Sequence, residues 1–233
     1  MSMPKEKIAG ISVFLLAGII FPLFSYAQYN DNGQTTVTPP VKDEFFKYSI
    51  QAGTEITYAV SNNAMVLDFP NNVYAANVAF DASIIKRLYV GAEFFDDQFA
   101  VSKTRYTAIN PRMFLYMGGL RVGYRSATGN DFLFNASVTA GPAYIHYTDV
   151  IIAAPKGGFS QTSQFGQLMV TENYRCADQF WIGLDVSFTY LTYQYNPDYI
   201  GMNTLYPFAK SDYQGPTTFI GWGFQLFYVF SKK

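Results

Sequence analysis

The clearest pattern in the chain is an alternation of apolar side chains over residues 217–230, close to its C-terminal end. One face of this stretch carries only large apolar residues: Ile220, Trp222, Phe224, Leu226, Tyr228 and Phe230. A period of two predicts a β-strand, and a wholly apolar face is typical of a strand that faces lipid. An open sheet edge has no hydrogen-bond partners in hydrocarbon, so we expect the remaining strands to close a barrel.

The same period predicts seven further strands, over residues 46–60, 73–84, 88–95, 113–125, 132–147, 165–175 and 180–193. The connections are alternately long (61–72, 96–111, 148–163, 194–215) and short (85–87, 126–131, 176–179). Outer-membrane barrels combine long outside loops with short periplasmic turns. We therefore predict an all-β fold, an eight-stranded antiparallel up-and-down transmembrane β-barrel with both termini in the periplasm. A soluble secreted barrel would have polar outer faces, whereas these are aromatic and aliphatic. Because Pro142 follows Gly141 and cannot donate to a ladder, we also expect a bulge there.

Composition supports a membrane barrel and argues against several other classes. Only 14% of the residues are charged, against about 25% in an average soluble domain, and 18% are aromatic. The net charge of −1 and the lack of a basic run predict no nucleic-acid partner. With one cysteine, Cys176 in a predicted turn, and one histidine, His146, we expect no disulfide framework, metal site or cofactor.

The N-terminal segment has the pattern of a secretory signal peptide. Lys5 and Lys7 precede an apolar run over residues 8–24, and Ser25-Tyr26-Ala27 places small residues at a cleavage site. The alternative is a retained membrane helix, for which the run is short and interrupted by Pro22. We predict a signal peptide over residues 1–27, a flexible periplasmic lead-in over 28–44 and the barrel over 45–233.

Polar residues gather on the inward faces of the predicted strands. The chemically strongest of them are Glu55, Asp81, Glu93, Arg121, Asp185 and Gln225. Eight strands enclose a space that side chains just fill, and buried charges need partners. The prediction is a buried network in which Arg121 is the one inward cation and Glu93 its partner. The alternative is a narrow gated ion path.

The chain resembles the small eight-stranded outer-membrane barrels, in the broad group of OmpA-type transmembrane domains, and within it the PorT-like barrels. The resemblance covers residues 45–230 and rests on the strand pattern and on the terminal alternation of Phe224, Leu226, Tyr228 and Phe230. It implies a bacterial outer-membrane location, contact with outer-membrane lipid and recognition of the last strand by the barrel-assembly machinery. The family usually ends on the aromatic residue, whereas Ser231-Lys232-Lys233 follow here.

The sequence leaves three functions open. The first is a structural or accessory barrel that binds another outer-membrane or secretion-complex protein through its loops or wall, as the PorT-like resemblance implies. The second is a narrow channel. The third is a lipid-modifying enzyme, because outer-membrane lipid A deacylases use an outward histidine beside a serine; here Thr148 stands two residues after His146, so that pattern is not matched, and we expect no enzyme.

The predicted loops are rich in tyrosine: Tyr106, Tyr193, Tyr195, Tyr199, Tyr206 and Tyr213. These residues suit either adaptable binding or an interfacial aromatic girdle.

Overall fold

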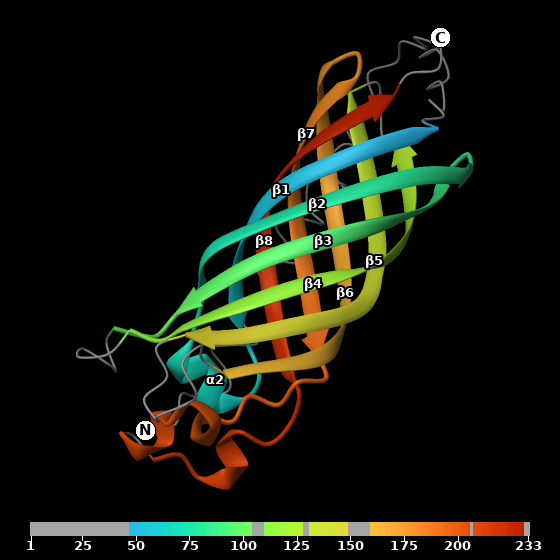
Figure 1. Ribbon diagram of the computed structural model, residues 1–233. Helices are drawn as coiled ribbons and strands as arrows, with labels where there is room; N and C mark the ends of the chain where they lie inside the picture. The colour runs from blue at the N-terminus through green and yellow to red at the C-terminus, as the bar shows by residue number, and fades with distance from the viewer. Residues whose placement is uncertain (1–46, 104–109, 128–130, 149–158, 206, 231–233) are drawn as a thin grey trace, which may run out of the picture. The chain divides into compact units, whose positions relative to one another are not determined.

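The computed structural model describes residues 47–103, 110–127, 131–148, 159–205 and 207–230. In this part of the chain, eight antiparallel strands close a barrel in sequence order (Figure 1). They are β1 (Tyr48–Ala59), β2 (Asn72–Ile85), β3 (Leu88–Ala100), β4 (Arg112–Ala127), β5 (Phe132–Thr148), β6 (Phe159–Ala177), β7 (Phe180–Leu191) and β8 (Thr217–Phe230). The predicted up-and-down barrel is confirmed. The predicted signal peptide and lead-in lie outside the described residues.

The last strand closes the barrel against the first, as the lipid-facing pattern requires. The β1–β8 ladder runs from Tyr48 opposite Phe230 to Ala59 opposite Phe219, so neither strand has a free edge. The side chains of β8 alternate as predicted: Phe224 is 56% exposed on the outer wall, whereas Phe227 is 1% exposed inside. β6 keeps the same alternation, with Leu168 outside and Met169 inside.

Several strand ends differ from the prediction. β3 continues to Ala100 rather than ending at residue 95, and β6 begins at Phe159 rather than at residue 165. The sequence hides both extensions because polar residues, Asp96 to Gln98 in β3 and Ser160 to Gln164 in β6, interrupt the apolar alternation. These segments lie near the long loops, where an outward side chain no longer needs to be apolar. β7 ends at Leu191, and Cys176 belongs to the end of β6 rather than to a turn.

The predicted bulge at Gly141 and Pro142 is wrong. Met117 pairs with Ala143 and Leu120 with Ala140, so the β4–β5 register is the same on both sides of Pro142. The missing N–H of proline interrupts the ladder without adding a residue to it. Gly119 and Gly141 instead let the two backbones approach, since a Cβ atom on either would overlap the opposite strand.

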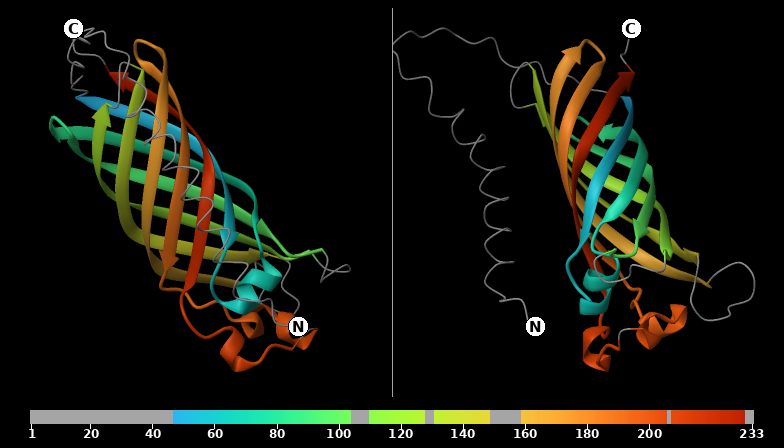
Figure 2. Two further views of the ribbon diagram at one scale, coloured as in Figure 1. Left: turned by 180° about the vertical axis from the view of Figure 1, so that it is seen from behind. Right: turned by 90° about the vertical axis from the view of Figure 1, so that its left-hand side faces the viewer.

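Two of the predicted loops are partly helical. The first of the four long loops, residues 61–72, contains α2 (Asn63–Asp68). The fourth, residues 194–215, contains three 3-10 helices, η1 (Pro197–Ile200), η2 (Met202–Thr204) and η3 (Lys210–Asp212). They gather at the end of the barrel opposite the β2–β3 turn, which we call the loop end (Figures 1 and 2). None of the helices formed by the described residues is long and apolar enough to span a membrane.

The barrel interior is layered along its axis. At the end of the short turns, Leu133, Trp181, Phe227 and Val229 form a small apolar cluster. A polar layer follows it on the side toward the loop end. At the loop end a larger apolar cluster fills the barrel; its members from α2 and the fourth loop, together with the strand residues they cover, form what we call the apolar plug: Met65, Phe69, Phe99, Tyr147, Tyr195, Ile200 and Met202.

Candidate functional site

The polar layer of the barrel is built around Arg121 of β4. Its side chain is fully buried, with Nη1 3.4 Å from Glu93 Oε1, Nε 3.9 Å from Asp81 Oδ1, and Nη2 donating to Gln51 Oε1 at 3.1 Å. Glu93 also accepts from the Thr139 hydroxyl at 2.6 Å. The ion pair of Arg121 with Glu93 therefore forms as the sequence suggested, supported by hydrogen bonds from neighbouring strands.

Arg121 is not the one inward cation, which corrects the sequence interpretation. Arg125 is also buried, and its Nη2 lies 3.2 Å from Asp81 Oδ2 and 3.1 Å from Ser49 Oγ. Its guanidinium lies 4.6 Å from the ring centroids of both Tyr89 and Phe227. Arg125 has the same parity as Arg121, so extending the alternation to the end of the predicted strand would have found it.

Glu55 lies nearer the loop end than Arg121, in a second group of polar residues. Its Oε2 accepts from the Ser187 hydroxyl at 2.6 Å, and its Oε1 accepts from Asn77 Nδ2 at 3.4 Å. Gly221 of β8 makes the room for this contact, because a Cβ atom there would meet both the Glu55 carboxylate and the Ser187 hydroxyl.

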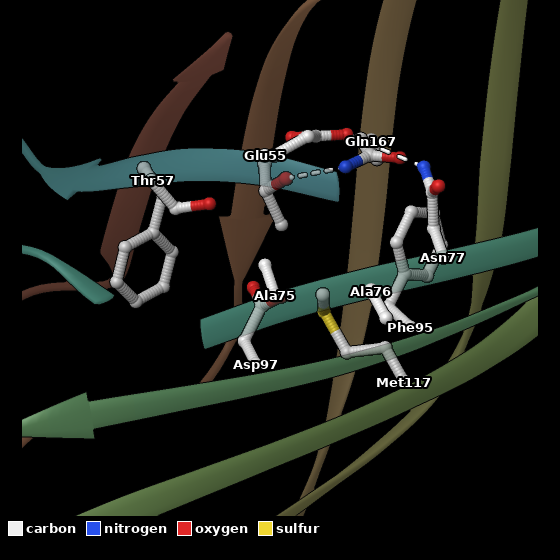
Figure 3. A pocket seen from close by; sticks show the side chains of 11 residues that line it. Glu55, Thr57, Ala75, Ala76, Asn77, Phe95, Asp97, Met117 and Gln167 are labelled. Atoms are coloured by element: carbon white, nitrogen blue, oxygen red, sulfur yellow. Dashed lines mark hydrogen bonds between the residues drawn. The ribbon is translucent and has the colours of Figure 1, made fainter. Parts of the chain in front are cut away.

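A cavity borders Glu55, with Asp97, Thr57 and Met117 among its lining residues (Figure 3). Its volume is only about 10 Å³, which is room for about one water molecule. At this position beside Glu55, the described side chains leave room for little more than one water molecule.

The remaining predicted interior residues, Asp185 and Gln225, do not join the Arg121 network. Gln225 accepts from the Thr171 hydroxyl at 3.5 Å and donates to Met169 Sδ at 2.9 Å. Asp185 is 2% exposed, and neither carboxylate oxygen has a hydrogen-bond partner among the described residues. The six predicted residues are thus all buried, but they form separate groups rather than one network.

The loops close the barrel through buried tyrosines. Tyr195 donates to Asp68 Oδ2 of α2 at 2.7 Å, and the Tyr147 and Tyr193 hydroxyls are 3.1 Å apart. Burial raises the pKa of Tyr193 to about 12 and that of Tyr195 well above its ordinary value. Tyr193 and Tyr195 therefore belong neither to an adaptable binding surface nor to a girdle.

The other loop tyrosines have different positions. Tyr199 is 51% exposed and packs on Phe159 with ring centroids 5.3 Å apart. Tyr213 is partly exposed, and Tyr106 and Tyr206 lie outside the described residues.

The plug is tied to the barrel rim by a capped helix. Asn62, at a φ of 62°, precedes α2 and accepts from Met65 N at 3.2 Å, while its Nδ2 donates to Tyr195 O at 3.0 Å. The Ser61 hydroxyl donates to Pro216 O at 2.8 Å and accepts from Thr218 N at 2.9 Å. The first and fourth loops therefore form one hydrogen-bonded cap.

The outer wall holds a pair that sequence reasoning missed. His146 Nδ1 lies 2.8 Å from the Ser160 hydroxyl on the neighbouring strand β6, and the Tyr144 hydroxyl donates to the same oxygen at 2.9 Å. The sequence pattern shows only the neighbours of His146 on its own strand, whereas the register pairs His146 with Ser160 across the ladder. The pair has the components of a nucleophile and a base, but the described contacts give it no orienting acid.

The described residues contain no group of three or more His, Cys, Asp or Glu side chains placed to hold a metal ion. Cys176 is exposed and free.

Comparisons with known proteins bear on the fold. No protein-family model matches the chain, and the search of curated proteins found no match. Among solved structures, Neisserial surface protein A superposes with a TM-score of 0.53 at 8% identity, covering 79% of this chain and 97% of that one. At this identity the likeness concerns the fold alone, a small barrel of the outer-membrane type.

Two further solved structures give lower scores. The attachment invasion locus protein Ail of Yersinia pestis, in complex with the heparin analogue sucrose octasulfate, has a TM-score of 0.47 at 12% identity, covering 80% of this chain and 99% of that one. The outer membrane protein OprG of Pseudomonas aeruginosa has a TM-score of 0.40 at 10% identity, covering 81% and 98%.

Proposed function

We propose that this protein is an integral barrel of the bacterial outer membrane with a filled interior, and that it serves as a structural or accessory component rather than as a channel or an enzyme. The observation that carries the proposal is the filled lumen. The apolar plug closes the loop end, the Arg121 network fills the middle, and the cavity beside Glu55 has a volume of only about 10 Å³. An ion would have to displace buried apolar side chains and break paired charges to pass.

Conductance in planar lipid bilayers tests the filled interior. The purified full chain, shown to be inserted by heat-modifiable migration in gels, should give no steady current. A stable conductance of nanosiemens size in inserted protein would establish the narrow channel instead.

The loop-end cap supports the proposed accessory role. Its hydrogen bonds hold the first and fourth loops together, so it presents a fixed surface. Large apolar side chains remain exposed on it, with Leu67 46%, Tyr199 51% and Leu205 44% accessible. Preorganised, exposed aromatic and aliphatic groups suit contact with another outer-membrane or secretion-complex protein, of the kind that the PorT-like resemblance implies.

Co-purification from native membranes in mild detergent tests this role with a matched pair of variants. Tyr199 packs on Phe159, and Tyr174, at the opposite end of the barrel, packs on Phe132. Both tyrosines are about half exposed, and the ring centroids of each pair are 5.3 Å apart. Tyr199→Ser should reduce recovery of the partner, whereas Tyr174→Ser should not. Equal recovery with both variants would place the contact elsewhere, and no specific partner with the wild type would refute the role.

A lipid-modifying activity is the second candidate, and one observation favours it, the Ser160–His146 contact. We propose that the pair is not catalytic, because the described contacts of His146 include no orienting acid and the strand ladder occupies the local backbone donors that an oxyanion would need. Release of fatty acid from outer-membrane lipid by the wild type, abolished in Ser160→Ala, would overturn this.

A further inference from the structure

The outer wall of the barrel carries an apolar groove where small residues replace large ones. It has a volume of about 550 Å³ and extends from Ile50 of β1 across β2 to β5 as far as Thr162 of β6. Strands β2 to β4 of this wall face the viewer in Figure 1. Ala92 and Gly118 form part of its lining, beside the aromatic side chains of Phe80, Phe94 and Tyr144. Gly118 lies directly under the Phe94 ring, since a Cβ atom there would be 2.9 Å from that ring.

The groove lies where the β4–β5 ladder is interrupted. Pro142 lines it and has no N–H to donate, and the outward position opposite it is Gly118, which has no side chain. Both features thin the wall at the same level. The volume falls within the roughly 300–1,000 Å³ range of ligand pockets.

One end of the groove leads to a polar cluster. Tyr144 and Thr162 line the groove, and the Tyr144 hydroxyl donates to Ser160, which also contacts His146. Arg112 is exposed on β4, two ladder pairs beyond the Phe114–His146 pair toward the loop end and therefore at the next outward position. Apolar lining, hydroxyl and imidazole groups, and a cation thus follow one another along the wall.

We propose that this groove binds one acyl chain of a net anionic, phosphorylated lipid of the outer leaflet, with the lipid phosphate held by Arg112 and the Ser160–His146 pair. The inference rests on the proposed outer-membrane location, which sets the loop end outside and the groove in hydrocarbon. An acyl chain matches the apolar lining, and arginine and hydroxyl donors match a phosphate. Bulk lipid contacts the outer wall of any membrane barrel, so the selectivity for one lipid class comes from the polar cluster at one end of the groove.

Native mass spectrometry of the full chain tests retention of the lipid. Protein taken from nanodiscs of equimolar phosphatidylglycerol and phosphatidylcholine into detergent should keep one phosphatidylglycerol. Gly118→Leu fills the groove and should lower retention about tenfold, the effect of losing roughly 1.4 kcal/mol of binding. Gly166→Leu is the matched control, an outward glycine of β6 with open space around it and no place in the groove.

Further variants keep the test decisive. Ala92→Leu fills the groove from β3 and replaces Gly118→Leu if that variant does not insert. Arg112→Gln should abolish the preference for phosphatidylglycerol over phosphatidylcholine while the groove still holds a chain. Inserted wild type that retains no lipid, or equal retention by the Gly118 and Gly166 variants, would overturn this inference and leave the proposed function standing; wild type that does not insert would overturn both.

Photo-crosslinking in cells distinguishes lipid from a protein occupant. A photoreactive residue at Ala92 should give an adduct with the mass of a phosphorylated lipid, more strongly than one at Leu184 on the outer face of β7. A discrete protein adduct at Ala92 would show that the groove is a docking site for a partner, and would refute the lipid assignment.

Discussion

Replacing Arg121 by methionine should destabilise the barrel by about 4 kcal/mol. The substitution conserves most of the volume but removes the cation beside Glu93, whose remaining contact is the Thr139 hydroxyl at 2.6 Å. Breaking a buried pair from one side costs about 3–5 kcal/mol, because it leaves an uncompensated charge. Asp81 keeps Arg125 at 3.2 Å and Gln51 at 2.8 Å, so the loss concentrates on Glu93.

Urea unfolding in lipid vesicles, followed by tryptophan fluorescence, measures this free energy. Lys86→Met in the exposed β2–β3 turn is the matched control and should change stability by less than about 0.5 kcal/mol. The double variant Arg121→Met with Glu93→Gln should recover part of the loss, since it removes the stranded carboxylate. If Glu93→Gln instead adds a further loss in the Arg121→Met background, the ion-pair reasoning is wrong.

Three further predictions concern the last strand, its packing and the cap. Phe224→Arg should cost about 2–4 kcal/mol in vesicle refolding and Phe230→Arg about 0–1, because only the first puts the charge near the bilayer midplane; loss of Phe230 that matters only in cells would indicate its reading by the assembly machinery. Gly221→Ala should destabilise by about 1–3 kcal/mol, since the new methyl overlaps buried polar groups, whereas Gly166→Ala should be neutral by the same unfolding assay. Burial raises the pKa of Tyr193 to about 12, so the fold favours the neutral phenol. Its contribution to the free energy of unfolding, at most about 3 kcal/mol, is present below pH 10 and is lost as the pH rises to about 12. Protease cleavage of the fourth loop should increase over that range, and cleavage unchanged up to pH 12 would contradict the prediction.

The strands and their facing could be predicted because lipid favours an apolar residue at most outward positions within the hydrocarbon. That constraint makes the alternation of β8 visible without any knowledge of its neighbours. It ends where the strands leave hydrocarbon, and the extension of β6 over Ser160 to Gln164 was missed for this reason. The short helix α2 was missed because six residues are too few to show a helical period.

For the candidate sites, the alternation along each strand predicts only whether a residue faces the interior or the outer wall. Parity places Glu55 and Asp185 inside the barrel, but only the strand register puts Ser187 and Asn77 against Glu55 and leaves Asp185 apart. The Ser160–His146 contact depends in the same way on the β5–β6 register, which no single strand encodes. Contacts across a ladder thus require pairing information that the pattern of one strand lacks.

The division of the interior indicates where function can reside. A barrel of this size needs inward side chains that fill it together, whereas almost any apolar residue satisfies its outer wall. Identity of 8% to a barrel that shares the fold is expected under such loose outward constraints. Positions that depart from both demands are therefore the informative ones: the exposed Tyr199 on the cap, and Gly118 and Arg112 on the wall, are not needed to close or fill the barrel. Function belongs to such grafted features rather than to the fold, so the variants Tyr199→Ser, Gly118→Leu and Arg112→Gln test partner and lipid binding while leaving the closing ladder and the buried interior unchanged.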